Sequence, residues 1–272
     1  MHEASKTPSP LVSIILPAFN AEKYIREAIE SVLLQDYKNI ELLIIDDCST
    51  DATASIINSF SDLRIIFIKN DLNLGLIRTL NRGLGLARGN FIGRIDADDV
   101  WHDNTKISLQ MQYFYEYPDT ILIGTDAIAI DDLGNDIFQI KNHYENNYIK
   151  KHFLIGNPFI HPSVIFKKDK ALEVGGFLDE DLYIEDYSLW LRMGKIGAIA
   201  NLPKPLMKYR IHNLGVSQKN TLLQIKNSLL LIKKYKRDYG GYWIGFIKWH
   251  TKLLIINFSS IQVVNNLKRL FN

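Results

Sequence analysis

The sequence predicts an α/β fold in which a mostly parallel central sheet is flanked by helices. Four apolar runs occur in the first hundred residues, and each is apolar throughout instead of at alternate positions. Such runs are expected for parallel strands that are covered on both faces. Amphipathic stretches separate the runs, so strands and helices alternate along the chain. This order favours a doubly wound sheet with right-handed crossovers between its strands.

The four predicted strands are residues 12–16, 40–45, 64–68 and 90–95. The first helix between them is expected within residues 22–35, where apolar side chains recur on one helical face. The second begins in the segment Asp51-Ala-Thr-Ala-Ser55, behind an Asp or Ser cap. The third spans residues 77–87 and ends before Gly89.

The pattern is less regular after residue 100. We expect strands at residues 121–124 and 163–166, a short helix at residues 186–193, and helical stretches from about residue 221 onward. Of the 272 residues, 47% are apolar and 23% are charged, which suits one large globular domain with an appendage. No run reaches the roughly 18 uninterrupted apolar residues of a membrane span.

Cysteine content and charge bear on location and partners. Cys48 is the only cysteine, so no intrachain disulfide can form and we expect a reducing, cytoplasmic location. Residues 1–10 are polar, lack the apolar core of a signal peptide, and are expected to be a disordered lead-in. Residues 221–272 hold nine basic residues and one acidic residue, although the net charge of the chain is only +2. This asymmetry predicts an acidic body with a basic tail.

Polar and acidic loops follow three of the predicted strands. They are Pro17–Asn20, Asp46–Asp51 and Asp96–Asp99. In an open α/β sheet, ligands bind beyond the carboxyl ends of the strands, so the three loops should meet at one rim. Their convergence predicts a binding site more strongly than any single motif does.

The third loop places two carboxylates, Asp96 and Asp98, two residues apart. Side chains at this spacing point broadly the same way from an extended segment. Together they form a partial shell for a hard cation, and the open positions suit Mg²⁺ or Mn²⁺ that bridges to substrate phosphates. The alternative is an acidic turn in which Asp99 caps a following helix. We favour the metal site because a second acidic strand end lies opposite, and we assign Asp99 a supporting or capping role.

The second loop places Asp46 and Asp47 where another central strand ends. A carboxylate at this point can accept hydrogen bonds from the N–H and O–H groups of a nucleotide, and Asp47 is the preferred candidate. The structural alternative is that Asp46 accepts hydrogen bonds from loop amides and that Asp51 caps the next helix.

Longer segments match, in order and spacing, the motifs of one enzyme family. LVSIILPAFNAEKYIREAIESVLLQ, ELLIIDDCSTDAT and NLGLIRTLNRGLGLARGNFIGRIDADD together resemble the nucleotide-sugar domain of family 2 glycosyltransferases of the GT-A fold. GNPFIHPSVIFKK, GGFLDEDLYIEDYSLWLR and KYRIHNLGVS resemble the acceptor half of bacterial members that build surface polysaccharides. The resemblance covers roughly residues 11–215. It implies a Rossmann-like GT-A catalytic domain over residues 11–220, with a nucleotide-sugar half (11–100) and an acceptor half (101–220), followed by a helical extension (221–272).

The resemblance also implies roles for individual residues. The implied nucleotide-sugar-binding residues are Pro17, Phe19, Asn20, Asp47, Arg78 and Asp96. Within this set Asp47 would contact the base, and Asp96 would contact the ribose or the metal. Asp98 would bind the metal that bridges the diphosphate, and His212 would lie on the metal or the diphosphate. Asp186 corresponds to the catalytic base of the family.

These residue types suit sugar transfer. The leaving diphosphate gains negative charge, which a divalent cation neutralises as a Lewis acid. A general base must take the proton of the acceptor hydroxyl during attack. A carboxylate across the sugar from the leaving group fits a single in-line displacement that inverts the anomeric carbon. Without the resemblance, Glu185 and Asp186 would be interpreted as two favourable acids in the first turn of a helix.

Further residues are expected on the acceptor side or in support of the site, namely Glu185, His161, Arg210 and Trp190. His161 is a candidate for shaping the acceptor cleft, with structural packing as the alternative. Arg210 precedes His212 by two residues in a predicted loop and is expected to support it. Trp190 fits the core or the cleft wall better than a sugar-stacking platform. Cys48 departs from the family pattern, which commonly has a small residue such as glycine at this position.

The tail combines basic residues with Trp243, Phe246 and Trp249. This composition is typical of an amphipathic element in a membrane interface, where anionic lipids attract cations and indoles prefer the headgroup zone. It predicts peripheral contact with the inner face of the plasma membrane. The alternative is a helix pair packed on the catalytic domain or on another subunit. Nucleic-acid binding would also explain the positive charge, but no recognition motif accompanies it.

We therefore expect an inverting glycosyltransferase that depends on Mn²⁺ or Mg²⁺. It would move a sugar from a nucleotide-diphospho-sugar, a UDP-sugar by preference, to a glycan or lipid-linked acceptor in bacterial surface polysaccharide synthesis. Two other classes stay open. A non-catalytic sugar-nucleotide binder would share the pocket, although the intact Asp96, Asp98 and Asp186 argue against it. A phosphoacceptor signalling domain would explain the acidic end of the second strand, but not the third loop or the Glu185–Asp186 pair.

Overall fold

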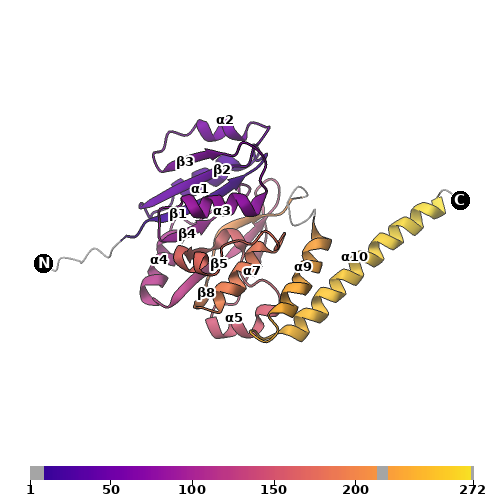
Figure 1. Cartoon of the computed structure of the whole chain (residues 1–272). Helices are drawn as coiled ribbons and strands as arrows, with labels where there is room; N and C mark the ends of the chain where they lie inside the picture. The colour runs from indigo at the N-terminus through magenta and orange to yellow at the C-terminus, as the bar shows by residue number, and fades with distance from the viewer. Residues whose placement is uncertain (1–8, 213–219, 271–272) are drawn as a thin grey trace.

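The computed structural model describes residues 9–212 and 220–270, with side chains up to residue 256. Most of the predicted disordered lead-in, residues 1–8, therefore lies outside the described part. The α/β fold is confirmed: a central sheet of eight strands has helices packed against both faces (Figure 1).

The first half of the sheet follows the predicted alternation of strands and helices. Its elements are β1 (Val12–Ala18), α1 (Ile25–Leu33), β2 (Ile40–Asp46), α2 (Thr53–Asn58), β3 (Ile65–Lys69), α3 (Leu76–Leu86) and β4 (Phe91–Arg94). The four strands lie in the order β3-β2-β1-β4 and all pair in parallel. β1 and β2 are buried along their whole length, because helices cover both faces of the sheet.

The second half makes the sheet mixed. Its elements are α4 (Lys106–Glu116), β5 (Thr120–Ile130), β6 (Asp136–Ile140), α5 (Asn146–His152), the 3₁₀ turns η1 (Phe153–Ile155) and η2 (His161–Ser163), β7 (Ile165–Lys167), α6 (Lys168–Glu173), α7 (Glu185–Gly194) and β8 (Ala198–Arg210). β7 lies antiparallel between β4 and β5, and β6 is antiparallel to β5. β8 runs parallel to β5 over almost its whole length.

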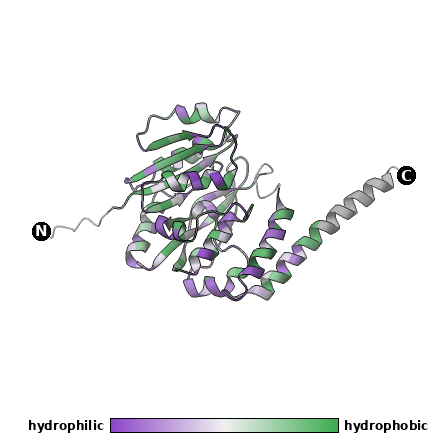
Figure 2. Ribbon diagram, in the orientation of Figure 1, coloured by the Kyte–Doolittle hydropathy of each residue, from purple (hydrophilic) through white to green (hydrophobic). Residues whose placement is uncertain are grey.

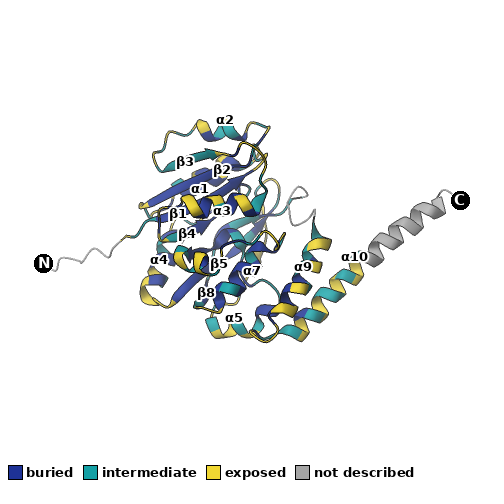
Figure 3. Cartoon of the chain, in the orientation of Figure 1, coloured by how far each residue is buried: buried dark blue, intermediate teal, exposed yellow. Residues whose placement is uncertain are grey.

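Alternate side chains of the central strands point into two separate cores. On one face, Ile15 and Leu43 pack in a cluster that also holds apolar side chains of α3 and α7. On the other face, Ile14 and Leu42 belong to a cluster with α1 and α4. Figure 2 shows the hydrophobic colouring of these strands and Figure 3 their burial. Two filled faces are the packing expected of a doubly wound sheet.

The C-terminal extension consists of α9 (Thr221–Lys234) and α10 (Tyr242–Leu270). The inner face of α9 is buried in the α7-side core, and the loop after it is tied to the body, since the Tyr239 hydroxyl donates to the carbonyl of Leu191 at 2.6 Å. α10 crosses η1 so closely that a Cβ added at Gly245 would lie 1.8 Å from the carbonyl oxygen of Leu154. Beyond this crossing α10 projects away from the body (Figure 1). Among the described residues, no helix is both long and apolar enough to cross a membrane.

Candidate active site

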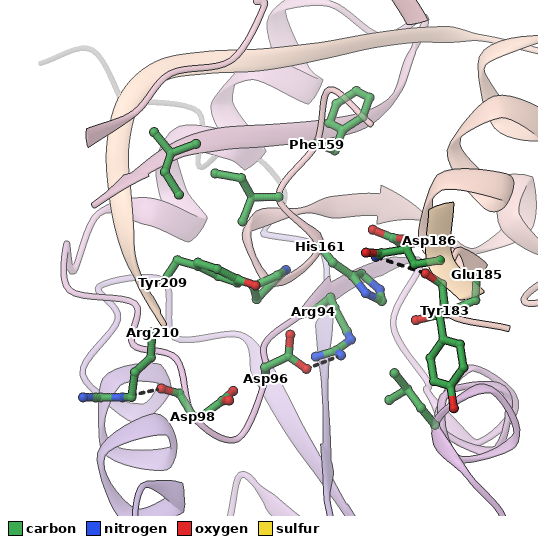
Figure 4. Close-up of a pocket in the computed structure, with 15 residues that line it drawn as sticks. Arg94, Asp96, Asp98, Phe159, His161, Tyr183, Glu185, Asp186, Tyr209 and Arg210 are labelled. Carbon is green, nitrogen blue, oxygen red and sulfur yellow. Dashed lines mark hydrogen bonds and ion pairs between the residues drawn. The ribbon is translucent and has the colours of Figure 1, made fainter. Parts of the chain in front are cut away.

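A cavity of about 330 Å³ opens next to the carboxyl end of β4 (Figure 4). Most of its lining comes from four stretches of chain: the β4 loop, the segment before β7, the start of α7 and the end of β8. Leu76, Ile140 and Gln224 complete the wall. The predicted site residues that line it are Asp96, Asp98, His161, Glu185, Asp186 and Arg210. The topology thus brings together acids that lie about ninety residues apart in the sequence.

Asp98 and His212 form a pair at one side of this cavity. Nε2 of His212 lies 2.7 Å from Oδ2 of Asp98, and the imidazole packs against the ring of Tyr24 at a centroid distance of 5.5 Å. Burial, together with the charge of Asp96, raises the pKa of Asp98. A carboxylate oxygen and an imidazole nitrogen at this separation can bind the same divalent cation, and such a mixed set suits Mn²⁺. The residues present therefore fit the metal that the sequence predicts.

Asp96 has a partner that the sequence analysis missed. Nη2 of Arg94, the last residue of β4, donates to Oδ1 of Asp96 at 2.5 Å. Arg94 is only 1% exposed, whereas the side chain of Asp96 is 32% exposed. The signal was present, because a charged residue inside an otherwise apolar strand is seldom buried without a partner.

Arg210 holds the acidic loop in place. Its backbone N–H donates to Oδ1 of Asp99, and its Nε donates to the carbonyl of Asp98, both at 2.8 Å. Its Nη2 pairs with Glu27 of α1 at 2.6 Å. With these contacts the guanidinium supports the loop, and Asp99 is a buried acceptor inside it.

Glu185 and Asp186 form the first turn of α7. Asp186 accepts hydrogen bonds from Nδ2 of Asn157 and from the backbone N–H of Tyr187, both at 2.7 Å. Burial raises the pKa of Asp186 to about 6, and these hydrogen bonds and the charge of Arg94 oppose the rise. Burial and the charge of Asp186 raise the pKa of Glu185 to about 8. Asp186 is therefore the member of the pair that is ionised near neutral pH.

His161 lies beside this pair. One ligand atom each from His161, Glu185 and Asp186 lie within 4.8 Å of one another, which could hold a metal ion. Burial, helped by the positive charge of Arg94, lowers the pKa of His161 well below its usual value. The same charge disfavours a divalent cation here, so the Asp98–His212 pair is the better metal site.

Trp190 lies in the core behind the cavity wall. It is fully buried, and its ring contacts those of Phe159, His161 and Phe166 at centroid distances of 5.4 to 6.3 Å. It therefore supports His161 from behind and does not line the cavity.

The predicted nucleotide residues lie outside this cavity. Asn20 joins the first two loops, because its Oδ1 accepts from the backbone N–H of Thr50 at 2.9 Å. Phe19 is 51% exposed and Pro17 is buried in β1. Arg78 pairs with exposed Asp179 at 3.2 Å. These four residues line no part of the described cavity.

Asp47 also lies outside the cavity and organises the loop that leads into α3. Its carboxylate accepts hydrogen bonds from Nδ2 of Asn70 and from the backbone N–H groups of Leu74 and Gly75, at 2.7 to 2.9 Å. Asp46 accepts from the backbone N–H of Ser49 at 3.0 Å, as the structural alternative expects. The N-cap residue of α2 is Ala52, so the predicted Asp or Ser cap is wrong, although Asp51 just before it accepts from the backbone N–H of Thr53 at 2.9 Å.

Cys48 has a left-handed backbone conformation, with φ of 66°. This conformation favours glycine, which explains in physical terms why a small residue is common at this position of the motif. Its thiol points to the carbonyl of Asp71 at 3.7 Å.

Comparisons with known proteins identify relatives over most of this chain. A glycosyltransferase of Haemophilus influenzae is 33% identical over 90% of this chain and 78% of its own length. The amylovoran biosynthesis glycosyltransferase AmsE of Erwinia amylovora is 28% identical over 96% of this chain and 98% of its own. WfaP of Escherichia coli, a UDP-Glc:alpha-D-GlcNAc-diphosphoundecaprenol beta-1,3-glucosyltransferase, is 33% identical over 81% of this chain and 85% of its own.

Solved structures share the fold. Residues 1–349 of TarS of S. aureus, in complex with UDP-GlcNAc, superpose with a TM-score of 0.67 at 21% identity, covering 89% of this chain and 72% of that one. The mannosyltransferase PcManGT of Pyrobaculum calidifontis, in complex with GDP-Man and Mn²⁺, gives a TM-score of 0.66 at 17% identity, covering 91% of this chain and 70% of that one. The sequence model of Glycosyl transferase family 2 matches residues 13–175, more than half of the chain, and the chain belongs to this family.

Proposed function

We propose that the protein is an inverting, metal-dependent glycosyltransferase that takes its sugar from a nucleotide-diphospho-sugar. The observation that carries the proposal is the placement of two chemically different acidic groups at one cavity. Asp98, with His212, lies at one side, and Asp186 lies at the other (Figure 4). The donor diphosphate belongs at the first group and the acceptor hydroxyl at the second.

In the proposed reaction, Asp186 takes the proton of the acceptor hydroxyl as the oxygen attacks the anomeric carbon. The bond between that carbon and the diphosphate breaks on the opposite face, so the configuration inverts. Asn157 fixes the orientation of the Asp186 carboxylate, and the lower pKa of Asp186 within the pair keeps it available as a base.

Asp98 and His212 would hold Mn²⁺ or Mg²⁺, which neutralises the charge that develops on the leaving nucleoside diphosphate. Asp96, held by Arg94, lies beside them and would contact the ribose or the metal. Pro17, Phe19, Asn20 and Asp47 would form the nucleotide pocket next to the cavity, with Arg78 nearby.

For the donor we propose a UDP-sugar, and for the acceptor a glycan or a lipid-linked glycan of bacterial surface polysaccharide synthesis. The names of two relatives support this choice: WfaP takes UDP-Glc and acts on a diphosphoundecaprenol-linked sugar, and AmsE serves amylovoran biosynthesis. His161 and Glu185 would lie on the acceptor side.

We further propose that the protein works in the cytoplasm, with α10 in contact with the inner face of the membrane. Large apolar side chains of its first turns are exposed, among them Trp243 (71%), Ile247 (64%) and Leu254 (68%), and the tail is strongly basic. Binding to vesicles with and without anionic phosphatidylglycerol tests this proposal. The double variant W243A/I247A should lose vesicle binding. Equal vesicle binding by the wild type and the variant would refute the proposed membrane contact.

The central test is a thermal-shift screen of UDP-, GDP- and dTDP-sugars with Mn²⁺, followed by donor turnover. We expect one donor class to stabilise the wild type, and Asp98→Ala to lose this metal-dependent effect. Absence of any metal-dependent nucleotide binding by the wild type would refute the proposal. Binding without any turnover or transfer would instead favour the non-catalytic binder.

A further inference from the structure

Arg94 has hydrogen-bonding capacity that the fold does not use. It lies at the end of β4 with 1% exposure, and its Nη2 pairs with Asp96. Its Nε and Nη1 are buried and have no hydrogen-bond partner among the described residues. Buried donors of a charged group are costly to leave unpaired, so a ligand that accepts these hydrogen bonds would be stabilised.

The cavity has the size of a sugar subsite. A volume of about 330 Å³ is at the lower end of the range of ligand pockets, roughly 300–1,000 Å³. The residues expected to bind the nucleotide, including Phe19, Asn20 and Asp47, lie outside it. The transferred sugar must lie between the leaving diphosphate and the base, which places it in this cavity.

Arg94 lies where that sugar would be. It belongs to the cavity wall, with Asp96 on one side and the Glu185–Asp186 pair beyond His161 on the other (Figure 4). A residue between the diphosphate end and the base end faces the sugar itself. This placement distinguishes Arg94 from Arg210, whose guanidinium is occupied by Glu27 and by backbone carbonyls.

The charges around Arg94 select the chemistry of its ligand. The carboxyl groups of Asp96, Asp99, Glu185 and Asp186 all interact with its positive charge. A further anionic group, such as the carboxylate of a uronic acid, would be repelled by this surrounding. The hydroxyl of a neutral sugar can accept N–H hydrogen bonds without adding charge.

We propose that Arg94 is a binding residue of the sugar subsite, donating hydrogen bonds from Nε and Nη1 to separate hydroxyl oxygens of a neutral transferred sugar. Because Nε and Nη1 are buried, the proposed contact requires the guanidinium to tilt toward the cavity about its pair with Asp96. The inference rests on the proposed function and adds to it a residue that contacts the sugar and not the nucleotide.

The test separates sugar binding from nucleotide binding. Dissociation constants are measured by calorimetry with Mn²⁺ for UDP and for whichever of UDP-glucose, UDP-galactose and UDP-N-acetylglucosamine binds most tightly. Arg94→Lys keeps the charge that pairs with Asp96 but loses the planar fork of donors. We expect it to weaken donor binding about tenfold or more and to change UDP binding less than about twofold. Arg192→Lys is the matched control, because Arg192 also has unpartnered buried nitrogens but does not line the cavity.

Each outcome bears on the inference. If Arg94→Lys weakens the binding of UDP and of the donor sugar nucleotide equally, Arg94 acts only through Asp96 and the inference is wrong. The inference is also wrong if neither dissociation constant changes. Deoxy analogues of the bound sugar give a second test on the wild-type protein, which does not depend on the stability of the variant. At least one missing hydroxyl should cost about tenfold in affinity, and uniform affinity across the analogues would overturn the proposal. A wild type that binds UDP without any added affinity for a UDP-sugar refutes the sugar contact alone, whereas one that binds neither refutes the proposed function as well.

Discussion

Replacement of Glu185 by glutamine should stabilise the protein at alkaline pH. Glu185 is buried at 7% exposure beside Asp186, and burial with the charge of Asp186 raises its pKa from 4.5 to about 8. In the folded state the side chain therefore keeps its proton at neutral pH. Glutamine has the same shape and no charge, so the variant reproduces the neutral form permanently.

The direction of the change in stability with pH follows from proton binding. Between pH 4.5 and about 8 the folded state holds a proton on Glu185 that the unfolded state has released, so the free energy of unfolding falls as the pH rises through this window. The interval corresponds to about 5 kcal/mol at about 1.36 kcal/mol per pH unit. The second N–H of a buried amide needs a partner, which lowers the expected gain to about 2–3 kcal/mol.

Urea unfolding of the wild type and of Glu185→Gln, followed by tryptophan fluorescence at pH 5.0 and 8.5, measures this gain. Trp101 and Trp190 are almost fully buried, so unfolding should change the signal strongly. The variant should exceed the wild type at pH 8.5 and fall about 1–2 kcal/mol below it at pH 5.0, because the wild type regains about 4 kcal/mol over this interval. Glu180→Gln, at an exposed position, should change little at either pH. Equal stability of wild type and Glu185→Gln at both pH values would show that Glu185 is ionised in the fold and would refute the reasoning.

Three further predictions concern the base, the nucleotide loop and the extension. Asp186→Asn should keep its affinity for the donor and transfer sugar about 10²- to 10⁴-fold more slowly; full activity of the variant would remove Asp186 as the base. In the wild type, initial rates of transfer measured from pH 5 to 8 should fall about tenfold per pH unit below the pKa of Asp186, which is near 6. Cys48 is partly exposed in the proposed nucleotide loop, so UDP with Mn²⁺ should slow its alkylation, followed by mass spectrometry, and an unchanged rate would place the nucleotide elsewhere. Gly245→Leu should lower the melting temperature in calorimetry, because its side chain collides with the carbonyl of Leu154, while Thr251→Leu at an exposed position of α10 should not; equal melting temperatures would mean that the crossing does not stabilise the fold.

The sequence predicted the first half of the fold better than the second. β1 and β2 are continuous apolar runs because helices bury both of their faces, and such runs are visible without a structure. β8 contains Pro203 and Pro205, which no periodicity identifies as a strand; its register against β5 shifts around these residues and so tolerates them. β5 was predicted only at residues 121–124 because the polar residues Thr125 and Asp126 interrupt its apolar pattern.

Individual contacts in the site were less accessible to sequence reasoning than its composition. Asp98, His212 and Asp186 could be named in advance because they stand in motifs. Asn157 could not, since its contact with Asp186 exists only after α7 packs beside η1 and no local pattern marks it. Arg94 stood within the motif, and only the structure shows that its charge acts on both Asp96 and the Glu185–Asp186 pair.

The three aspartates of the acidic loop are compensated in three different ways. Asp96 has the guanidinium of Arg94 at 2.5 Å. Asp99 is fully buried, so burial raises its pKa well above the usual value, and it accepts the backbone N–H of Arg210. Asp98 has only His212 as a side-chain partner among the described residues, and an imidazole offers a full positive charge only when protonated. Asp98 is therefore the carboxylate with the most to gain from a divalent cation, which is why we place the metal there and not beside Arg94.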